Sequence, residues 1–347
     1  MIQPRRDPPP QLPVATPQPW GGVAAIGTRS AGPRVRLVAT GGTISNRSSG
    51  RLSAEELVKS VPTLALYATP EFEQFTNIAS SQLTLTQWLD LARRINELFR
   101  TDPTLGGVVV TSGTDTLEEL AYFLNLTVRE ARPVVVVGSM RNPSTVGYEG
   151  AANLLEGFRV AADPASRGRG VLVVLNDEIN AAREVTKTDA LRLQTFQSRG
   201  YGLLGVVDPD RVVYYRRSER RHTAASEFDV ASITRIPRVD VIVTYQGANG
   251  DLINAAVDAG AQGIVIATAG AGATSGTQAD GIRYATSKNV AVVMTTRTGA
   301  GRIAGGGGRG LTIAGEDLAP IKARILLMLA LTKTRDAAEL RRIFSDY

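Results

Sequence analysis

Residues 35–40 are a run of aliphatic and β-branched residues with one arginine, and the run ends in the pair Gly41 and Gly42. A short apolar run closed by a Gly-Gly breaker predicts a buried parallel strand. Thr43 follows at once, so we expect it just past the strand's carboxyl end, where ligands bind in open α/β sheets. Glycines let the backbone turn sharply beside a ligand. Thr43 is therefore a candidate nucleophile, and a tight turn with a solvated threonine is the alternative.

A second strand ends in the same way. Residues 107–112 form another apolar run, and Gly-Thr-Asp-Thr at residues 113–116 follows it, before a helix expected to continue to about residue 128. Thr114 and Asp115 are candidate site residues at this junction. Helix capping by Asp115 or Thr116 is the alternative interpretation.

Strands and helices alternate along the rest of the chain. Further strands are predicted over residues 134–138 and 171–176, with helices over 53–59, 86–100 and 150–162. This alternation indicates a doubly wound parallel sheet. A second alternating unit has predicted strands over residues 239–244, 263–268 and 290–295 and a final helix over 317–331.

The 347-residue chain is long enough for two domains. We predict an α/β fold with a larger, flavodoxin-like N-terminal domain over residues 34–210, a linker over 211–236 and a smaller C-terminal α/β parallel-sheet domain over 237–347. Residues 1–33 contain eight of the 17 prolines. We expect that segment to be a disordered tail.

Composition excludes several chemistries. The chain has no cysteine, which rules out disulfides, thiolate metal sites and a cysteine nucleophile, and its single histidine, His222, argues against Ser-His-Asp catalysis and histidine-rich metal sites. We therefore expect no metal site.

The net charge of +6 has visible clusters at Arg216-Arg217 and Arg220-Arg221. No aromatic or groove-reading motif accompanies them, so a solvated basic face is favoured over a nucleic-acid site. No apolar span reaches 18 residues, and no convincing signal peptide precedes residue 34. We expect no membrane partner and a cytoplasmic location, with the periplasm as the alternative.

Four motifs together carry a family resemblance. They are Gly-Gly-Thr-Ile at residues 41–44, Gly-Thr-Asp-Thr at 113–116, Pro-Val-Val-Val-Val-Gly-Ser-Met-Arg at 133–141 and Val-Thr-Lys-Thr at 185–188. With them the chain resembles bacterial L-asparaginases and glutaminase-asparaginases from about residue 34 to its C-terminus. The resemblance implies hydrolysis of L-asparagine to L-aspartate and ammonia without a cofactor. It also implies a homotetramer of close dimers, with each active site completed across a subunit interface.

The resemblance assigns catalytic roles to four residues. Thr43 matches the threonine that attacks the side-chain amide and becomes an acyl ester. Thr114 matches the threonine of the second motif, and Asp115 matches the carboxylate that holds the substrate's α-amino group. Lys187, which pattern alone would assign to a solvated side chain, matches the lysine that completes the set. Which member carries the proton stays open.

The resemblance also implies substrate contacts. Ser80 aligns with the serine that grips the α-carboxylate, and Ser81 lies beside it. Gly42 and Gly113 belong to the two glycine turns, whose backbone amides are candidates for binding the oxyanion. The substrate is therefore expected to be a small amino-acid amide.

The sequence departs from the family pattern at several positions. Residues 43–57 contain no tyrosine, where family members carry one in a flexible lid, and the lid itself is short. Ser112 stands where exported enzymes commonly have histidine. The glutamate that a neighbouring subunit supplies has no clear match in residues 299–315, and Asn249 is a candidate for another partner-supplied group. Tyr148 is a candidate substitute for the lid tyrosine.

These departures leave other functions open. They are hydrolysis of glutamine or another amide, and a catalytically weakened amino-acid-binding module. The basic charge and the N-terminal segment suggest a further alternative, the ammonia-releasing subunit of a tRNA-dependent amidotransferase.

Overall fold

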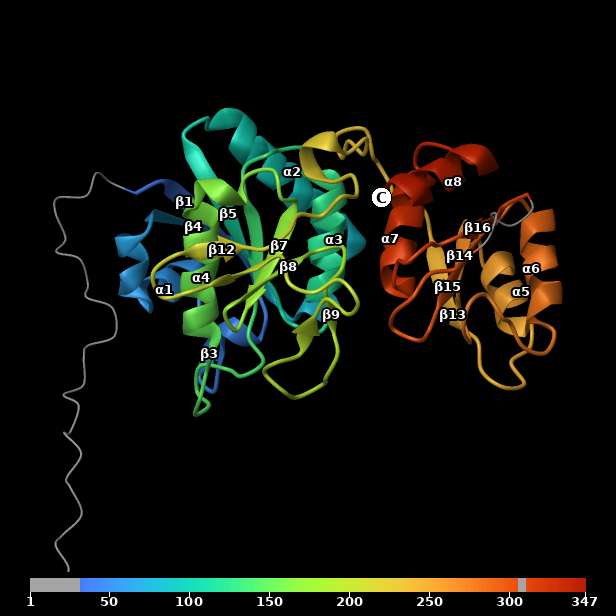
Figure 1. Cartoon of the computed structure of the whole chain (residues 1–347), viewed down its shortest axis with the longest axis horizontal. Coiled ribbons are helices and arrows are strands. Elements are labelled where there is room, and N and C mark those ends of the chain that lie inside the picture. Colours follow the sequence, from blue (N-terminus) through green and yellow to red (C-terminus); the bar gives the residue numbers. More distant parts are fainter. Residues whose placement is uncertain (1–31, 305–309) are drawn as a thin grey trace, which may run out of the picture. The chain divides into compact units, whose positions relative to one another are not determined.

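An eight-stranded mixed sheet forms the centre of the N-terminal part of the protein. The computed structural model describes residues 32–304 and 310–347 (Figure 1). The strand order is β12-β11-β8-β7-β6-β5-β1-β4. The strands are β1 (Arg34–Gly41), β4 (Thr69–Ile78), β5 (Leu105–Thr111), β6 (Val134–Val137), β7 (Val171–Leu175), β8 (Glu178–Ala181), β11 (Gly205–Val207) and β12 (Val212–Tyr214).

The predicted parallel sheet is the half that runs from β4 to β7. Neighbouring strands there are all parallel. Strands β8, β11 and β12 then continue the sheet antiparallel. Strand β8 follows β7 through a tight turn in which Asn176 and Asp177 have positive φ, 53° and 65°. A two-residue hairpin of this kind reverses the chain, and this is why the sheet becomes mixed.

Helices cover both faces of this sheet. Helices α2 (Leu85–Thr101) and α3 (Leu117–Thr127) pack on the face that carries Val108 and Val110. Helices α1 (Ala54–Lys59) and α4 (Gly150–Ala162) pack on the opposite face, which carries Val109. Successive strand residues point to opposite faces, so a run of valines supplies both cores. The doubly wound α/β class predicted from sequence is confirmed, and Figure 1 shows α3 and α4 on opposite sides of the sheet.

A smaller four-stranded parallel sheet follows, in the order β13-β14-β15-β16. Its strands are β13 (Val239–Val243), β14 (Gly263–Thr268), β15 (Ala291–Thr296) and β16 (Thr312–Ala314). One face packs against α5 (Asp251–Asp258) and α6 (Gln278–Ser287), and the other against α7 (Pro320–Ala330) and α8 (Ala337–Asp346).

The chain does not end in the predicted final helix, because α8 follows α7. Helix α8 begins after Asp336, whose side chain accepts a hydrogen bond from the Glu339 amide. Its buried stripe consists of Leu340, Ile343 and Phe344 alone, and the other positions are mostly charged. This is why the sequence pattern did not predict the helix.

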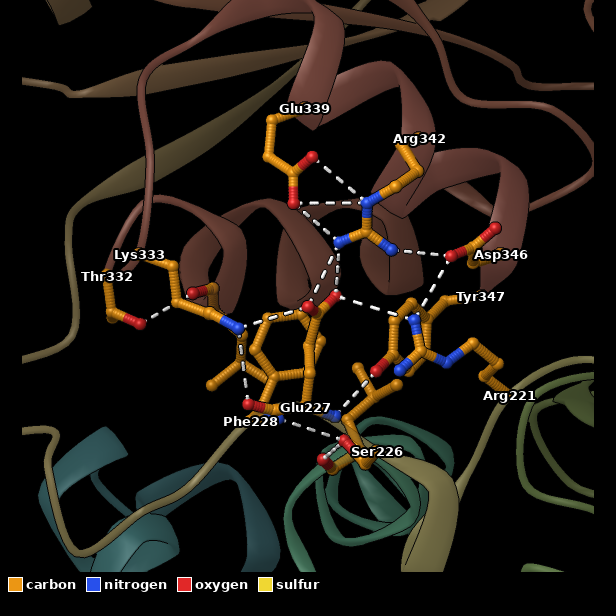
Figure 2. Close-up of polar contacts among 12 residues, drawn as sticks. Arg221, Ser226, Glu227, Phe228, Thr332, Lys333, Glu339, Arg342, Asp346 and Tyr347 are labelled. Carbon is orange, nitrogen blue, oxygen red and sulfur yellow. Dashed lines mark hydrogen bonds and ion pairs between the residues drawn. The ribbon is translucent and has the colours of Figure 1, made fainter.

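Helix α8 is fastened to the connecting segment between the two sheets. The Glu227 carboxylate accepts hydrogen bonds from Arg342 at 2.8 Å and from Lys333 at 3.0 Å (Figure 2). The Glu227 amide in turn donates to the Tyr347 hydroxyl at 2.7 Å.

Strand β12 lies within the predicted linker 211–236, so that segment supplies an edge strand as well as a connection. The domain boundaries themselves stay a prediction.

Two short ribbons complete the described part. Strands β2 (Asn46–Arg47) and β3 (Gly50–Arg51) form an exposed hairpin after the first glycine turn. Strands β9 (Thr186–Lys187) and β10 (Phe196–Gln197) pair so that Lys187 lies opposite Phe196. The tail predicted over residues 1–33 lies outside the described residues, apart from Gly32 and Pro33.

Candidate active site

The first glycine turn is built for close approach of three chain segments. Gly41 and Gly42 have φ of 106° and 91°, a region that favours glycine. A Cβ atom on Gly41 would lie 2.5 Å from the Ile78 carbonyl oxygen, and one on Gly42 would lie 2.3 Å from the Gly113 amide nitrogen. Only glycine fits at either position. The pair therefore brings Thr43 next to the ends of both β4 and β5.

Thr43 begins a short 3-10 turn and is half-buried. The Gly42 amide already donates to the Ile78 carbonyl at 3.0 Å. The contribution of Gly42 in this structure is thus to backbone shape.

Ser80 joins the same cluster from the end of β4. Its side chain is 4% exposed. A Cβ atom on Gly113 would come within 2.8 Å of Ser80 Oγ, so the glycine of the second turn makes room for this hydroxyl. Ser81 is exposed. Of the two serines, Ser80 is the one that contacts the second glycine turn.

The second turn carries Thr114, which is buried, and Asp115, whose side chain is 73% exposed. Helix α3 begins after Thr116, yet no side chain caps its first turn. Neither Asp115 nor Thr116 therefore caps α3, and the alternative interpretation of these two residues is wrong. Asp115 is left with most of its carboxylate facing solvent.

Lys187 reaches this turn from β9. Its ammonium group donates to Thr114 Oγ1 and to Asp115 Oδ1, each at 3.0 Å. The lysine side chain is only 16% exposed. The solvated interpretation of Lys187 is therefore wrong, because the ammonium is held by a hydroxyl and a carboxylate.

Glu118 is a member of this cluster that sequence inspection missed. Its Oε1 atom accepts hydrogen bonds from the Lys187 amide and from Thr186 Oγ1, each at 3.0 Å. Glu118 lies three residues after Asp115 in the first turn of α3, where the helix dipole favours a carboxylate. Glu118 could have been predicted from this spacing, because a residue one helical turn beyond a site residue lies on the same side of the helix.

Tyr148 lies against the first turn, where the lid tyrosine is absent. Its hydroxyl donates to the carbonyl oxygen of Ile44, the residue after Thr43, at 2.9 Å. Burial, together with the nearby Glu149, raises the pKa of the Tyr148 phenol. The phenol therefore stays protonated near neutral pH and acts as a hydrogen-bond donor.

A hollow opens on the lysine side of the cluster, lined by Asp115, Glu118, Lys187, Thr188, Asp189 and Ala190. Among the described residues, no group of three or more His, Asp or Glu side chains is placed to hold a metal ion. None of the helices in that part of the chain has the length and apolar character needed to span a bilayer.

Two family descriptions match the chain. "Asparaginase, N-terminal" matches residues 34–220, and "Glutaminase/Asparaginase C-terminal domain" matches residues 238–344. The chain is 41% identical over 327 residues to L-asparaginase 2 of Bacillus subtilis (strain 168), covering 91% of this chain and 87% of that protein. It is 39% identical over 329 residues to L-asparaginase 2 of Escherichia coli (strain K12), covering 91% and 93%.

A crystal structure of a probable cytoplasmic L-asparaginase from Campylobacter jejuni has the same fold. The TM-score is 0.85 at 37% sequence identity, and the match covers 91% of this chain and all of that one. The likeness therefore extends through both sheets.

Proposed function

Because this chain belongs to the asparaginase family, we propose that it hydrolyses the side-chain amide of L-asparagine to give L-aspartate and ammonia. The observation that carries the proposal is the contact of the Lys187 ammonium with both Thr114 and Asp115 at 3.0 Å, beside the turn that presents Thr43. The names of the relatives support the same substrate.

We propose Thr43 as the nucleophile. Its hydroxyl adds to the amide carbon, and ammonia leaves as the carbonyl re-forms, so that an acyl ester links substrate and enzyme. Water then hydrolyses the ester and releases aspartate. A threonine hydroxyl is a weak nucleophile at neutral pH and needs a neighbouring group to take its proton.

In this proposal Thr114 and Lys187 form the proton path, which carries the proton that Thr43 loses to the departing amide nitrogen. Lys187 donates to Thr114 Oγ1, so that oxygen is oriented and the threonine's own hydroxyl hydrogen is free to point elsewhere. Asp115 Oδ1 accepts a second hydrogen bond from the same lysine, which fixes the position of its side chain. A positioned acid-base group of this kind contributes about 10² to 10⁴ in rate.

We assign substrate binding to side chains from the two segments beside Thr43. The exposed carboxylate of Asp115 is proposed to hold the α-ammonium group, and Ser80 the α-carboxylate. The developing oxyanion needs backbone donors. Gly42 donates to Ile78 already, so the donor from the first turn is proposed to be another amide.

We further propose a homotetramer of close dimers in the cytoplasm. Three large side chains between the end of β13 and the first turn of α5 are exposed in the single chain, namely Val243, Tyr245 and Leu252, by 48%, 53% and 59%. Such side chains near Asn249 are consistent with a surface that a second copy covers. Domain limits at residues 34–210 and 237–347 are part of the same proposal.

Aspartate and ammonia release from a panel of amides tests the activity. We expect L-asparagine to be hydrolysed and L-glutamine to be hydrolysed more slowly, while Thr43→Ala loses turnover but binds L-asparagine. Full activity of Thr43→Ala would show that another residue is the nucleophile. Binding without turnover in the wild type would favour an amino-acid-binding module, and co-purification with tRNA or a partner subunit would favour an amidotransferase.

A further inference from the structure

A fully buried lysine on α7 holds the chain segment that leads to Lys187. Lys322 is 1% exposed, and its ammonium group donates to the carbonyl oxygens of Ala182 at 2.9 Å and Arg183 at 3.1 Å. It also donates to the carbonyl oxygen of Val185. An ammonium group has three donors, and these three carbonyls use all of them. Lys322 therefore fixes the backbone from Ala182 to Val185.

The same ammonium group faces the carboxylate of Glu118. Glu118 Oε2 lies 3.8 Å from Lys322 Nζ and is buried without a hydrogen-bond partner among the described residues. Glu118 Oε1 accepts from Thr186 and from the Lys187 amide. A buried carboxylate requires a compensating charge. Lys322 supplies that charge, so the two residues depend on each other.

Both contacts lead to the proposed acid-base group. Lys322 holds the residues just before β9, and Glu118 holds the Lys187 backbone, while the Lys187 side chain returns to Thr114 and Asp115. Asp115 and Glu118 lie three residues apart on one turn. The contacts thus form a closed ring from α7 through Lys187 to α3 and back to α7.

We propose that Lys322 and Glu118 are positioning residues that set the distance between Lys187 and the Thr114-Asp115 turn. The inference rests on the proposed function for Lys187. Lys322 lies on α7, which packs on the smaller C-terminal sheet. The inference therefore gives this part of the chain a role in positioning Lys187 of the same chain. A displacement of about 1 Å at a reacting group can cost on the order of 100-fold in rate.

Arg183 extends this support to the end of the chain. Its guanidinium pairs with Asp317 at 2.7 Å and donates to the Tyr347 carbonyl oxygen. Burial lowers the pKa of Lys322 to about 8, and the charge of Glu118 opposes that effect. The three carbonyl oxygens and the Glu118 carboxylate stabilise the ammonium group of Lys322 at its fully buried position.

Lys322→Met tests the role, since methionine fills the space without donating. We expect kcat for L-asparagine to fall about 10- to 100-fold. KM should change less than about threefold, because Ser80 and Asp115, the residues proposed to bind the substrate, are still present. Hydrogen exchange of the amides in residues 182–188 should rise. Wild-type kcat in a folded Lys322→Met enzyme would overturn the proposal.

Arg324→Met is the matched control on the same helix. Arg324 lies 3.8 Å from Glu119 and donates to the Val239 carbonyl, and neither contact involves residues 182–187. We expect this variant to keep wild-type kcat and wild-type exchange in residues 182–188. An equal loss of kcat in both variants would indicate a general effect of α7 and would overturn the proposal.

The double variant Lys322→Met with Glu118→Gln covers the case in which the single variant does not fold. It removes both buried charges, and the amide oxygen of the introduced glutamine can still accept from Thr186 and from the Lys187 amide. Such replacement of a buried pair is often tolerated. Reduced kcat with raised exchange in residues 182–188 supports the proposal, and wild-type values refute it. If the wild type releases no aspartate, the proposed function fails, while the exchange result still decides the positioning role.

Discussion

Replacing Tyr148 with phenylalanine tests how the first threonine is held without a lid tyrosine. The Tyr148 hydroxyl donates to the Ile44 carbonyl at 2.9 Å, and Ile44 is fully buried. A Cβ atom on Gly150 would overlap the Tyr148 ring, at 2.3 Å from Cε2, so glycine at that position makes room for the ring. Phenylalanine keeps the ring and removes only the donor.

The expected loss is that of one neutral hydrogen bond. Such a bond contributes about 0.5 to 1.5 kcal/mol net. If it holds Thr43 in its attacking orientation, kcat should fall about 2- to 10-fold. Because burial raises the pKa of the Tyr148 phenol, we expect no loss on the scale of about 10² to 10⁴ that removal of a proton acceptor causes.

Steady-state kinetics with L-asparagine and calorimetric melting measure the two effects. Tyr214→Phe is the control, because Tyr214 lies on the edge strand β12 and its hydroxyl shares a 2.6 Å hydrogen bond with Ser166, away from the site. Both variants should lose stability, and only Tyr148→Phe should lose kcat. Unchanged kcat in Tyr148→Phe would refute the positioning role, and a loss above roughly 100-fold would show that the phenol transfers a proton.

Lys187, the subunit assembly and a buried carboxyl on α4 provide three further tests. Lys187→Met should lower kcat by roughly 10² or more while the melting temperature is nearly kept, and retained kcat would remove Lys187 from the mechanism. Sedimentation should find a homotetramer, and an active monomer would contradict a shared site. Burial, with the neighbouring Asp177, raises the pKa of Glu156 from 4.5 to about 8. Between these values the folded state keeps a proton that the unfolded state releases, so stability falls as the pH rises, by at most about 1.4 kcal/mol per pH unit. Glu156→Gln should therefore raise the melting temperature more at about pH 8 than at about pH 5, and an equal shift at both would contradict this.

Local sequence was enough for the elements that hold the first two motifs. Apolar runs and glycine breakers predicted β1 and β5. The helix predicted over residues 53–59 is α1, which begins with a capping box of Ser53 and Glu56. Parallel strands place their carboxyl ends at one edge of a sheet, so two glycine turns after neighbouring strands predict one site. Strands β1 and β5 are indeed neighbours.

Edge strands and the last helix escaped prediction for a physical reason. Strand β4 is edge-exposed on its far side, and its alternation of charged and apolar residues is weak. Strands β11 and β12 have three residues each, too few for a pattern to develop. Their place is decided by the pairing of β11 with β8 and of β12 with β11, and pairing is a property of the folded sheet.

The α/β class, the family and the candidate residues Thr43, Thr114, Asp115 and Lys187 could all be predicted from the sequence. The contacts that hold Lys187 in place could not, because they form only in the folded chain. Glu118, Lys187 and Lys322 are far apart in the chain, and a lone lysine in an apolar helix has no local signal that names its partners. Periodicity reports which face of an element is buried, whereas the three carbonyls and the carboxylate around Lys322 come together only when α3, α7 and the turn after β8 pack against one another.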